Sequence, residues 1–325
     1  MLKRIDWIDW AKAIGIFLVV FAHVPFDREI RNIIYSFHMP LFFIISGFLH
    51  KDNSLVKNIK ALIIPYLIYT SIALFFRLLF SENIWGDFKT GIIGILYGVG
   101  YNTQNSFMPN VPCWFFISLF WVKLFYQFSL KRLKVISMIL ILTFLIILLK
   151  YFKSRNIDLL LSLDSAIMAL PFYYCGTLFK RYKIEFSLSK ITLIFISAIS
   201  AIMTVSLSIL NGRVSINACY FGKSLIIAYL SGIVGFIMVY CFTITRGNNN
   251  IVKNISESTP IILGTHILFL PVIIKCLNTL IINFININNT IVTLLIAFVG
   301  SILVLLISYY PSLFLKSKFP ILVGK

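Results

Sequence analysis

Residues 291–310 read IVTLLIAFVGSILVLLISYY, an uninterrupted run that contains no charged side chain. A helix of about 20 such residues is long enough to cross the hydrocarbon core of a bilayer. Comparable runs recur from Ala11 to Leu315, so we predict an all-α, polytopic membrane protein with about ten transmembrane helices. The expected spans are 8–25, 33–50, 61–80, 112–130, 135–151, 165–179, 191–210, 224–244, 260–284 and 290–315.

The composition of the whole chain agrees with this prediction. Of its 325 residues, 59% are hydrophobic and 12% are charged, whereas a soluble domain has roughly 25% charged residues. No repeat or shift in composition divides the chain, so we expect a single integral membrane domain over residues 1–325. The first apolar run contains Lys12 and lacks a small-residue cleavage site, and we interpret it as the first helix rather than a signal peptide. The Gly-rich residues 86–100 are expected to form a re-entrant or interfacial segment.

The net charge of +18 invites a nucleic-acid interpretation, but the distribution of the basic residues argues against it. They lie in short loops between apolar runs and form no stripe on a soluble domain. With the N-terminus inside, the inner segments hold roughly twice as many Lys and Arg residues as the outer ones, as the positive-inside rule requires. We therefore predict a multi-pass protein of the lipid bilayer with both termini in the cytoplasm and no nucleic-acid partner.

The five cysteines show no pattern of a metal site or a redox pair. None belongs to a CxxC pair, and none has a histidine at the spacing of a metal ligand. We interpret them as small apolar packing residues and predict no metal site.

The first predicted helix carries three ionisable side chains. Such a residue inside a membrane helix costs at least about 2.5 kcal/mol, so each is a functional hypothesis. Lys12 and His23 differ by about 20° of rotation and roughly 16 Å along the helix axis. Asp9 lies three residues before Lys12, close enough to pair with it. The alternative is an interfacial Asp9–Lys12 pair, with His23 as a capping residue.

Two more histidines fall inside predicted helices. His38 lies near the outer end of the second helix, at about the depth of His23, and the loop of residues 25–32 between the two helices is short. The two imidazoles can therefore meet, one as a base and the other to orient a hydroxyl group. His266 lies about two turns into the ninth span. The alternatives are a helix N-terminal position ahead of Pro40 for His38 and a packing role for His266.

Two residues at the predicted outer face are ambiguous. Trp114 opens the fourth helix, and tryptophan is common at any membrane–water interface. Asp164 opens the sixth helix and has the side chain of an N-cap. Both could instead contact a substrate. His50 follows the second helix in a Lys-rich inner loop, and we expect it to be an ordinary surface residue.

The order of these motifs resembles a known family. The pattern Asp-x-x-Lys-x-x-Gly-Ile-x-x-Val-Val-x-x-His runs from Asp9 to His23, and Phe-His-Met-Pro-Leu-Phe-Phe-x-x-Ser-Gly-Phe runs from Phe37 to Phe48. Weaker matches follow in the same order at Pro112–Phe116, Asp164, Ala169–Gly176, Ser258–Thr259 and His266. Together they are similar to the membrane-bound acyltransferase-3 family, and within it to the fucose 4-O-acetylase-like branch.

The resemblance implies an enzyme of the bacterial inner membrane that transfers an acyl group, usually acetyl, from acetyl-CoA to a sugar hydroxyl. The acceptor would be a surface polysaccharide or a lipid-linked glycan precursor, and no cofactor would be bound. His23 and Lys12 would be the key pair, with His23 as general base, Asp9 beside Lys12, and His38 holding the acceptor or the oxyanion. The residues expected to contact substrate are Trp114, Asp164, His266 and Ser46. Many members have Arg where this chain has Lys12, and lysine keeps the charge but loses the bidentate fork.

Two other functional classes stay open on the sequence alone. The same polar residues could line the pathway of a transporter that exports a glycan intermediate, although the absence of Asp and Glu from the middle helices weakens a proton-coupled mechanism. The chain could also be a non-catalytic membrane subunit that anchors a partner. It contains no Walker A, GxSxG or HExxH motif.

Overall fold

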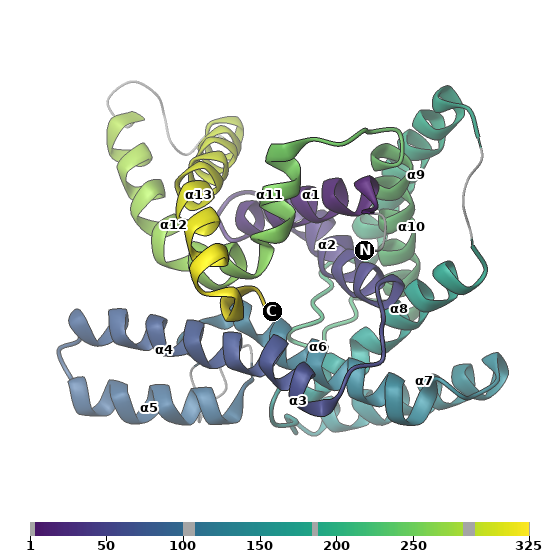
Figure 1. The fold of residues 1–325 in the computed structure, drawn as a ribbon, viewed down its shortest axis with the longest axis horizontal. Helices are drawn as coiled ribbons and strands as arrows, with labels where there is room; N and C mark the ends of the chain where they lie inside the picture. Colours follow the sequence, from purple (N-terminus) through teal and green to yellow (C-terminus); the bar gives the residue numbers. More distant parts are fainter. Residues whose placement is uncertain (1–3, 100–107, 184–187, 282–289, 325) are drawn as a thin grey trace. The chain divides into compact units, whose positions relative to one another are not determined.

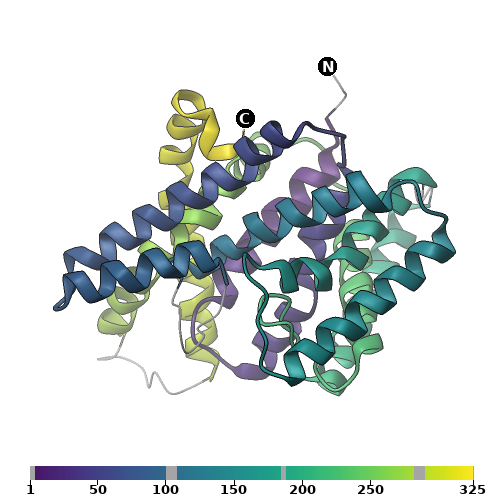
Figure 2. The same cartoon turned by 90° about the horizontal axis from the view of Figure 1, so that it is seen from below.

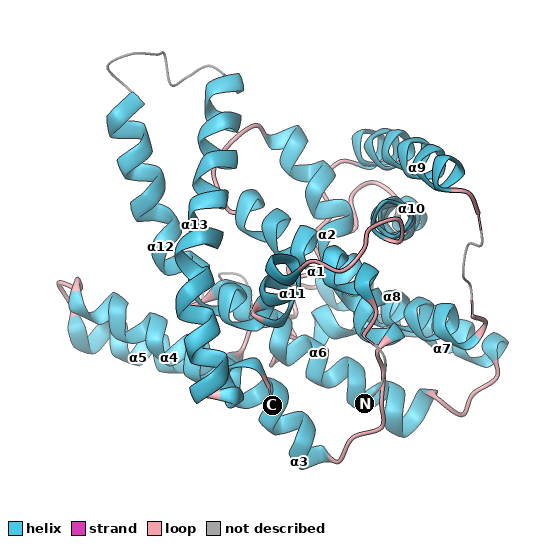
Figure 3. Cartoon of the chain, turned by 45° about the horizontal axis from the view of Figure 1, so that its top comes forward, coloured by secondary structure: helices cyan, strands magenta, loops and turns pink. Residues whose placement is uncertain are grey.

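The computed structural model describes residues 4–99, 108–183, 188–281 and 290–324. The protein is 80% helical, and Figures 1 and 3 show the arrangement of its helices within each part of the chain. Within the described ranges there is no strand, only one isolated antiparallel bridge between Ser215 and Tyr220. The predicted all-α membrane fold is confirmed. A chain in lipid must satisfy its backbone polar groups internally, and helices do so within one segment.

The helices are numbered in chain order in Figure 1. The first five are α1 (Asp6–Ala22), α2 (Arg28–Phe48), α3 (Leu55–Asn58), α4 (Ile64–Leu79) and α5 (Ile84–Tyr97). The next five are α6 (Trp114–Phe125), α7 (Val135–Ser154), α8 (Leu163–Arg181), α9 (Lys190–Asn211) and α10 (Leu225–Thr243). The last three are α11 (Asn250–Glu257), α12 (Thr259–Ile281) and α13 (Thr290–Lys318). Two π-helical turns extend this set, η1 (Ile59–Ile63) between α3 and α4, and η3 (Tyr126–Leu130) after α6.

Several helices begin where the sequence supplies a side-chain cap. The capping oxygen accepts a hydrogen bond from a backbone N–H of the first turn. The caps are Ser54, Asn83, Ser189, Ser224 and Asn249. These polar residues therefore fix where α3, α5, α9, α10 and α11 start.

Seven helical segments of the described chain are long and apolar enough to cross a membrane. They are Leu55–Leu79, Val111–Leu130, Val135–Ser154, Lys190–Asn211, Leu225–Thr243, Thr259–Leu280 and Thr290–Lys318. The other three predicted spans also form helices, α1, α2 and α8. However, α1 has only 17 residues, and the ends of α2 and α8 carry several charged side chains. A helix lies within the described residues of every predicted span, and residues 282–284 of the ninth span lie outside the described ranges. The number of ten crossings is not confirmed.

The chain separates into two compact units, each described by itself. The first contains residues 1–42, 183–214 and 221–323, and the second contains residues 43–182, 215–220 and 324–325. In the first unit α1 contacts α10, α11, α12 and α13. Trp7 packs edge-on against Tyr240 of α10, with ring centroids 5.0 Å apart. The helix that carries the first sequence motif is thus the centre of this unit.

Two contacts in the first unit define the direction of α12 relative to α1. Lys12 Nζ donates a hydrogen bond to the backbone oxygen of Ser256, 2.6 Å away. About eleven residues further along both segments, the rings of His23 and His266 meet with centroids 4.9 Å apart. Since the second contact follows the first in both segments, α1 and α12 run parallel. The predicted order of spans requires the same direction for its first and ninth helices.

The second unit contains a helical hairpin of α4 and α5. Residues 86–97 of the Gly-rich stretch predicted to be re-entrant or interfacial belong to α5, which lies beside α4 in Figures 1 and 2, and residue 100 lies outside the described ranges. Tyr66 of α4 donates a hydrogen bond to the backbone oxygen of Ile95, 2.6 Å away. With 14 residues, α5 is roughly 21 Å long, which is too short to cross a bilayer core of about 30 Å.

Helices α2 and α8 cross very closely in the second unit. A Cβ atom added at Gly47 would lie 2.0 Å from the backbone oxygen of Tyr173, and one added at Gly176 would lie 1.9 Å from that of Ile44. Only glycine fits at either position. Small residues at such crossings let two membrane helices pack backbone to backbone. Both glycines belong to motifs identified in the sequence, and they place the end of α2 beside α8.

Candidate active site

Three histidine rings of the first unit are anchored in the same way. Nδ1 of each ring lies within hydrogen-bond distance of a backbone oxygen in its own helix: 2.6 Å for His23 to Val19, 2.8 Å for His38 to Ile34 and 3.0 Å for His266 to Ile262. A carbonyl oxygen can only accept, so Nδ1 must carry the hydrogen. The neutral ring therefore presents Nε2 as an unprotonated acceptor. Each histidine has the tautomer that a general base needs.

His23 and His266 form the tightest pair among these rings. Their planes are inclined at 70°, with the centroids 4.9 Å apart in an edge-to-face arrangement. His266 is fully buried, and its Nε2 has no hydrogen-bond partner in the described part of the protein. A buried acceptor without a partner costs about 1–3 kcal/mol. This atom is therefore suited to accept a hydrogen bond from a bound hydroxyl group.

His38 belongs to the same neighbourhood. It is buried, its ring packs edge-on against Tyr35 with centroids 5.1 Å apart, and it lies within electrostatic range of His23. The sequence predicted that His23 and His38 would lie close together, and it missed the pair of His23 and His266. The pair was missed because the sequence does not show how α12 is aligned with α1. Ser256 lies beside Lys12, and this alignment brings His266 to the level of His23.

A charged network lies at the start of α1. Nε and Nη2 of Arg4 donate to the two carboxylate oxygens of Asp9, at 2.5 Å and 2.9 Å, and Nη1 donates to Glu257 at 2.5 Å. Lys316 of α13 donates to the other oxygen of Glu257, 2.8 Å away. The sequence expected Lys12 as the partner of Asp9, and it missed Arg4. The network ties the start of α1 to α11 and to the end of α13.

The pKa values of this network reflect its hydrogen bonds. The hydrogen bond to Asp9 is the largest influence on Arg4 and raises the pKa of its guanidinium. Burial alone would raise the pKa of Glu257, but the hydrogen bonds from Lys316 and Arg4 outweigh it and lower this pKa to about 2. Both groups are therefore fully charged at neutral pH.

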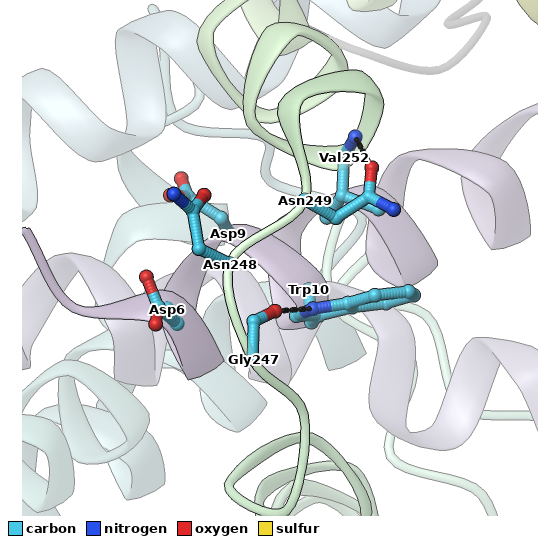
Figure 4. Close-up of a pocket in the computed structure, with 7 residues that line it drawn as sticks. All are labelled: Asp6, Asp9, Trp10, Gly247, Asn248, Asn249 and Val252. Atoms are coloured by element: carbon cyan, nitrogen blue, oxygen red, sulfur yellow. Dashed lines mark hydrogen bonds between the residues drawn. The ribbon is translucent and has the colours of Figure 1, made fainter.

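A small depression includes Asp9 of this network in its lining, and Figure 4 draws the lining residues. It has a volume of about 140 Å³ and is lined by Asp6, Asp9, Trp10, Gly247, Asn248, Asn249 and Val252. The Trp10 indole donates a hydrogen bond to the backbone oxygen of Gly247, 2.9 Å away, and so pins the loop between α10 and α11 onto α1. The volume of the depression is too small for a nucleotide or a sugar.

The other predicted substrate residues belong to the second unit. Trp114 is 5% exposed, and its ring packs against Phe43, with centroids 6.3 Å apart. Asp164 lies in the first turn of α8 and is 1% exposed. It is not the N-cap, because Ser162 occupies that position, and it forms an ion pair of 2.5 Å with Lys153. Ser46 is half-buried in α2. The substrate roles expected for these three residues stay predictions.

The sequence interpreted His50 wrongly as an ordinary surface residue. Its side chain is only 10% exposed, Nδ1 lies 2.6 Å from the hydroxyl of Tyr173, and Nε2 lies 3.1 Å from Asp52. Asp52 also accepts a hydrogen bond from Lys131. Burial is the main influence on His50 and lowers its pKa despite the Asp52 hydrogen bond. The signal for this contact was present in the sequence, because Gly47 and Gly176 bring α2 and α8 together.

Within the described ranges, no group of three His, Cys, Asp or Glu side chains could hold a metal ion. What the first unit offers is three neutral imidazoles that present acceptor nitrogens, together with a charged network near the start of α1. Such a set can remove a proton from a hydroxyl group as that group attacks a carbonyl carbon. The arrangement is suited to acyl transfer.

Comparison with known proteins agrees with this chemistry. Residues 5–310 match the family model of the acyltransferase domain of the acyltransferase-3 type. No curated protein and no solved structure matches the chain. The match covers nearly the whole chain and includes the helices that carry His23, His38 and His266, and the chain therefore belongs to the acyltransferase-3 family.

Proposed function

We propose that this membrane acyltransferase moves an acetyl group from acetyl-CoA to a sugar hydroxyl of a surface polysaccharide or a lipid-linked glycan precursor. We place it in the fucose 4-O-acetylase-like branch of its family and in the bacterial inner membrane, with both termini in the cytoplasm. The observation that carries the proposal is the pair of His23 and His266, whose centroids lie 4.9 Å apart, with Nδ1 of each ring held by a backbone oxygen.

In the proposed reaction, His23 is the general base. The acceptor hydroxyl donates its proton to Nε2 of His23 while its oxygen attacks the thioester carbon of the donor. The tetrahedral intermediate then expels the thiolate of coenzyme A, which takes the proton back from the imidazolium. His266 or His38 holds the acceptor hydroxyl before the attack. Two rings so close in a medium of low dielectric cannot both be charged, so one ring carries the proton and the other remains an acceptor.

Lys12 and Asp9 have supporting roles in this proposal. The Lys12 ammonium donates to the backbone oxygen of Ser256, just before α12. This contact sets the register of α12 against α1 and hence the position of His266 opposite His23. Asp9 anchors the start of α1 through Arg4. The motif residues of α1 thus act partly by positioning the helix that carries the second histidine.

The test is acetyl transfer in membranes that contain the protein. Radiolabelled acetyl-CoA is supplied with a lipid-linked glycan fraction, and label in glycan is measured for wild type, His23→Ala and His38→Ala. We expect the loss of His23 to lower transfer by about 10²–10⁴-fold, as for a general base. His50→Ala serves as a matched histidine control outside the first unit. Transfer at the wild-type rate by both folded variants would overturn the proposal.

A further inference from the structure

Two arginines of the first unit approach one tyrosine beside the histidine site. Arg31 lies in the first turn of α2, one turn before Tyr35 and on the same face of the helix. Arg213 follows the end of α9, and the charges of both guanidinium groups act on the Tyr35 hydroxyl. The Tyr35 ring packs edge-on against His38, with centroids 5.1 Å apart. Two positive charges and a hydroxyl group are thus gathered next to one of the site histidines.

The fold of the first unit holds the loop that carries Arg213 in place. The loop joins α9 to α10, and a Cβ atom added at Gly235 of α10 would lie 2.2 Å from Cβ of Phe37 in α2. Helices that approach so closely have a fixed position relative to each other. The side-chain oxygen of Asn211, at the end of α9, accepts a hydrogen bond from the backbone N–H of Ser224, 2.7 Å away. This bond ties the two ends of the loop together.

No acid of the described residues forms an ion pair with Arg31 or Arg213, and neither side chain makes a hydrogen bond there. Two acids precede Arg31 in the sequence. The Asp27 carboxylate caps α2, where it accepts hydrogen bonds from the backbone N–H groups of Glu29 and Ile30, at 2.9 Å and 3.0 Å. Glu29 is exposed and lies about 160° away from Arg31 around the helix. The positive charge of the two arginines is therefore available to a ligand.

The position of the two arginines is unusual for a membrane protein. By the predicted order of spans, the start of α2 and the loop after α9 both face the outer side, where the positive-inside rule disfavours basic residues. The guanidinium group is also better suited than an ammonium group to hold a carboxylate or phosphate through two parallel hydrogen bonds. Their place and their type both indicate recognition of an anion.

We infer that Arg31, Arg213 and Tyr35 bind a phosphate or carboxylate group of the acceptor. The guanidinium groups pair with the anionic oxygens, and the Tyr35 hydroxyl donates a further hydrogen bond. Seven residues separate Arg31 from His38, so the anion is held about 10 Å from His38 along α2. The inference rests on the proposed function, because it specifies the charge of the acceptor. The anion belongs either to an acidic sugar of the glycan or to the phosphate of a lipid carrier.

Binding of small anions to the purified full chain tests the inference and separates the two sources. The probes are methyl glucuronide for an acidic sugar, inorganic diphosphate for a lipid carrier, and methyl glucoside as the neutral control. By calorimetry, we expect at least one anion to bind tenfold or more tightly than methyl glucoside. Binding of the glucuronide alone would identify an acidic sugar as the source, and binding of diphosphate alone would identify the lipid carrier.

We expect Arg31→Gln and Arg213→Gln each to weaken binding of the anion about tenfold, as when charge-assisted hydrogen bonds are lost. Tyr35→Phe should weaken it less. All three variants should unfold at the wild-type temperature, because the arginines have no partner within the described residues. The matched control is Arg155→Gln, which removes an exposed arginine from another predicted outer loop. Equal affinity of wild type and both arginine variants, or no binding of either anion, would overturn the inference.

Kinetics distinguish a contact with the acceptor from a general effect on the site. With the lipid-linked glycan fraction as acceptor, we expect Arg31→Gln and Arg213→Gln to raise the apparent KM for the acceptor about tenfold. The KM for acetyl-CoA should not change. Arg31→Lys should recover part of the loss, because lysine keeps the charge without the planar fork. An equal rise in KM for both substrates would overturn the inference.

These outcomes also separate this inference from the proposed function. Anion binding that depends on Arg31 and Arg213, without any transfer to glycan, would keep the anion site and overturn the proposed function. Transfer that depends on His23 but is indifferent to both arginines would overturn the inference alone.

Discussion

His266 contains an atom that is unfavourable for folding and that the proposed reaction would use. Its Nε2 is buried and lacks a partner in the described structure, while its ring touches His23. We expect His266→Phe to keep the edge-to-face contact and to remove the unsatisfied nitrogen. The variant should therefore unfold at the wild-type temperature or above it, yet transfer acyl groups roughly 10²-fold more slowly, as when a polar contact to the reacting oxygen is lost.

Thermal unfolding in detergent and acetyl transfer in membranes measure the two effects separately. A His266→Phe variant with full activity would show that Nε2 takes no part in the reaction. A variant that is both unstable and inactive would indicate a packing role for the ring, which was the alternative interpretation of this histidine from the sequence.

Glu257 provides a prediction for the pH dependence of stability. The hydrogen bonds from Lys316 and Arg4 lower its pKa to about 2, from an ordinary value of 4.5. A carboxyl group with a lowered pKa in the folded state stabilises fully above its unfolded pKa and loses that contribution as the pH falls toward the folded value. We expect Glu257 to stabilise the protein above about pH 5 and to lose its contribution between about pH 4.5 and pH 2.

The matched variant is Glu257→Gln, which keeps the shape of the side chain. At pH 7 it should be less stable by roughly 1–2 kcal/mol, between the values for exposed and buried ion pairs. The difference from wild type should shrink as the pH is lowered from 5 to 3, as measured by unfolding monitored through tryptophan fluorescence. A difference that is constant with pH would contradict the assigned network.

At the scale of single residues, the sequence indicated which residues are unusual in their helices better than it indicated their partners. Asp9, Lys12 and His23 are recognisable because charged and titratable groups are unfavourable inside an apolar helix. Two of their partners lie far away along the chain: Ser256 for Lys12 and His266 for His23. Helical periodicity describes one helix at a time, so it cannot supply the register between two helices.

At the scale of elements, the crossing of α2 and α8 depends on two glycines. In Gly47→Ala or Gly176→Ala, the new methyl group would lie about 2 Å from a backbone oxygen of the other helix, which forces the helices apart. We expect each variant to be destabilised by about 1–3 kcal/mol, as for overpacked cores. Gly247→Ala is the matched control, because nothing lies within 4 Å of the added Cβ atom. The measurement is thermal unfolding of the purified variants.

The same crossing holds His50 beside Tyr173, 2.6 Å from its hydroxyl. The glycine variants should therefore also perturb the titration of His50, observed by NMR of labelled histidine. Wild-type stability and an unchanged His50 signal in both variants would show that the two helices can separate without loss.

The sequence predicted most elements well, and the exceptions have physical causes. Helices α4, α7, α9 and α13 were predicted from long apolar runs, because a helix that crosses a bilayer needs such a run. The amphipathic helix α11 was missed because it is only eight residues long and lies outside the spans. The hairpin of α4 and α5 was not predicted, and its second helix appeared in the sequence only as a Gly-rich segment. The packing of α5 against α4 depends on close contacts such as Gly91 with Leu74, which the sequence does not show.

At the scale of the whole molecule, each unit taken by itself groups certain helix ends through side-chain contacts. In the first unit the start of α1, the start of α12 and the end of α13 share contacts. In the second unit the ends of α2, α6 and α8 share contacts through the loop that precedes α3. Each set contains the ends that the predicted order of spans places on the inner side.

Cysteine labelling in a cysteine-free background tests this topology. We expect Arg132→Cys and Asn248→Cys to react with a membrane-impermeant maleimide only after the membrane is opened, because both lie in predicted inner loops. Glu82→Cys and Ile157→Cys should react in intact cells. All four positions are exposed, so burial does not limit the reaction. Labelling of Asn248→Cys in intact cells would contradict the predicted order of spans.

The way in which the histidine rings are held also affects how the protein enters the membrane. Each ring takes its orientation from a backbone oxygen of its own helix, so the site needs no buried carboxylate to steer it. A carboxylate at the centre of a membrane helix would add about 2.5–3.5 kcal/mol to insertion, and residues 13–22 of α1 carry no charge at all. If the proposed reaction takes place at these histidines, its centre consists of rings that can enter the bilayer one helix at a time, before any partner helix has been synthesised.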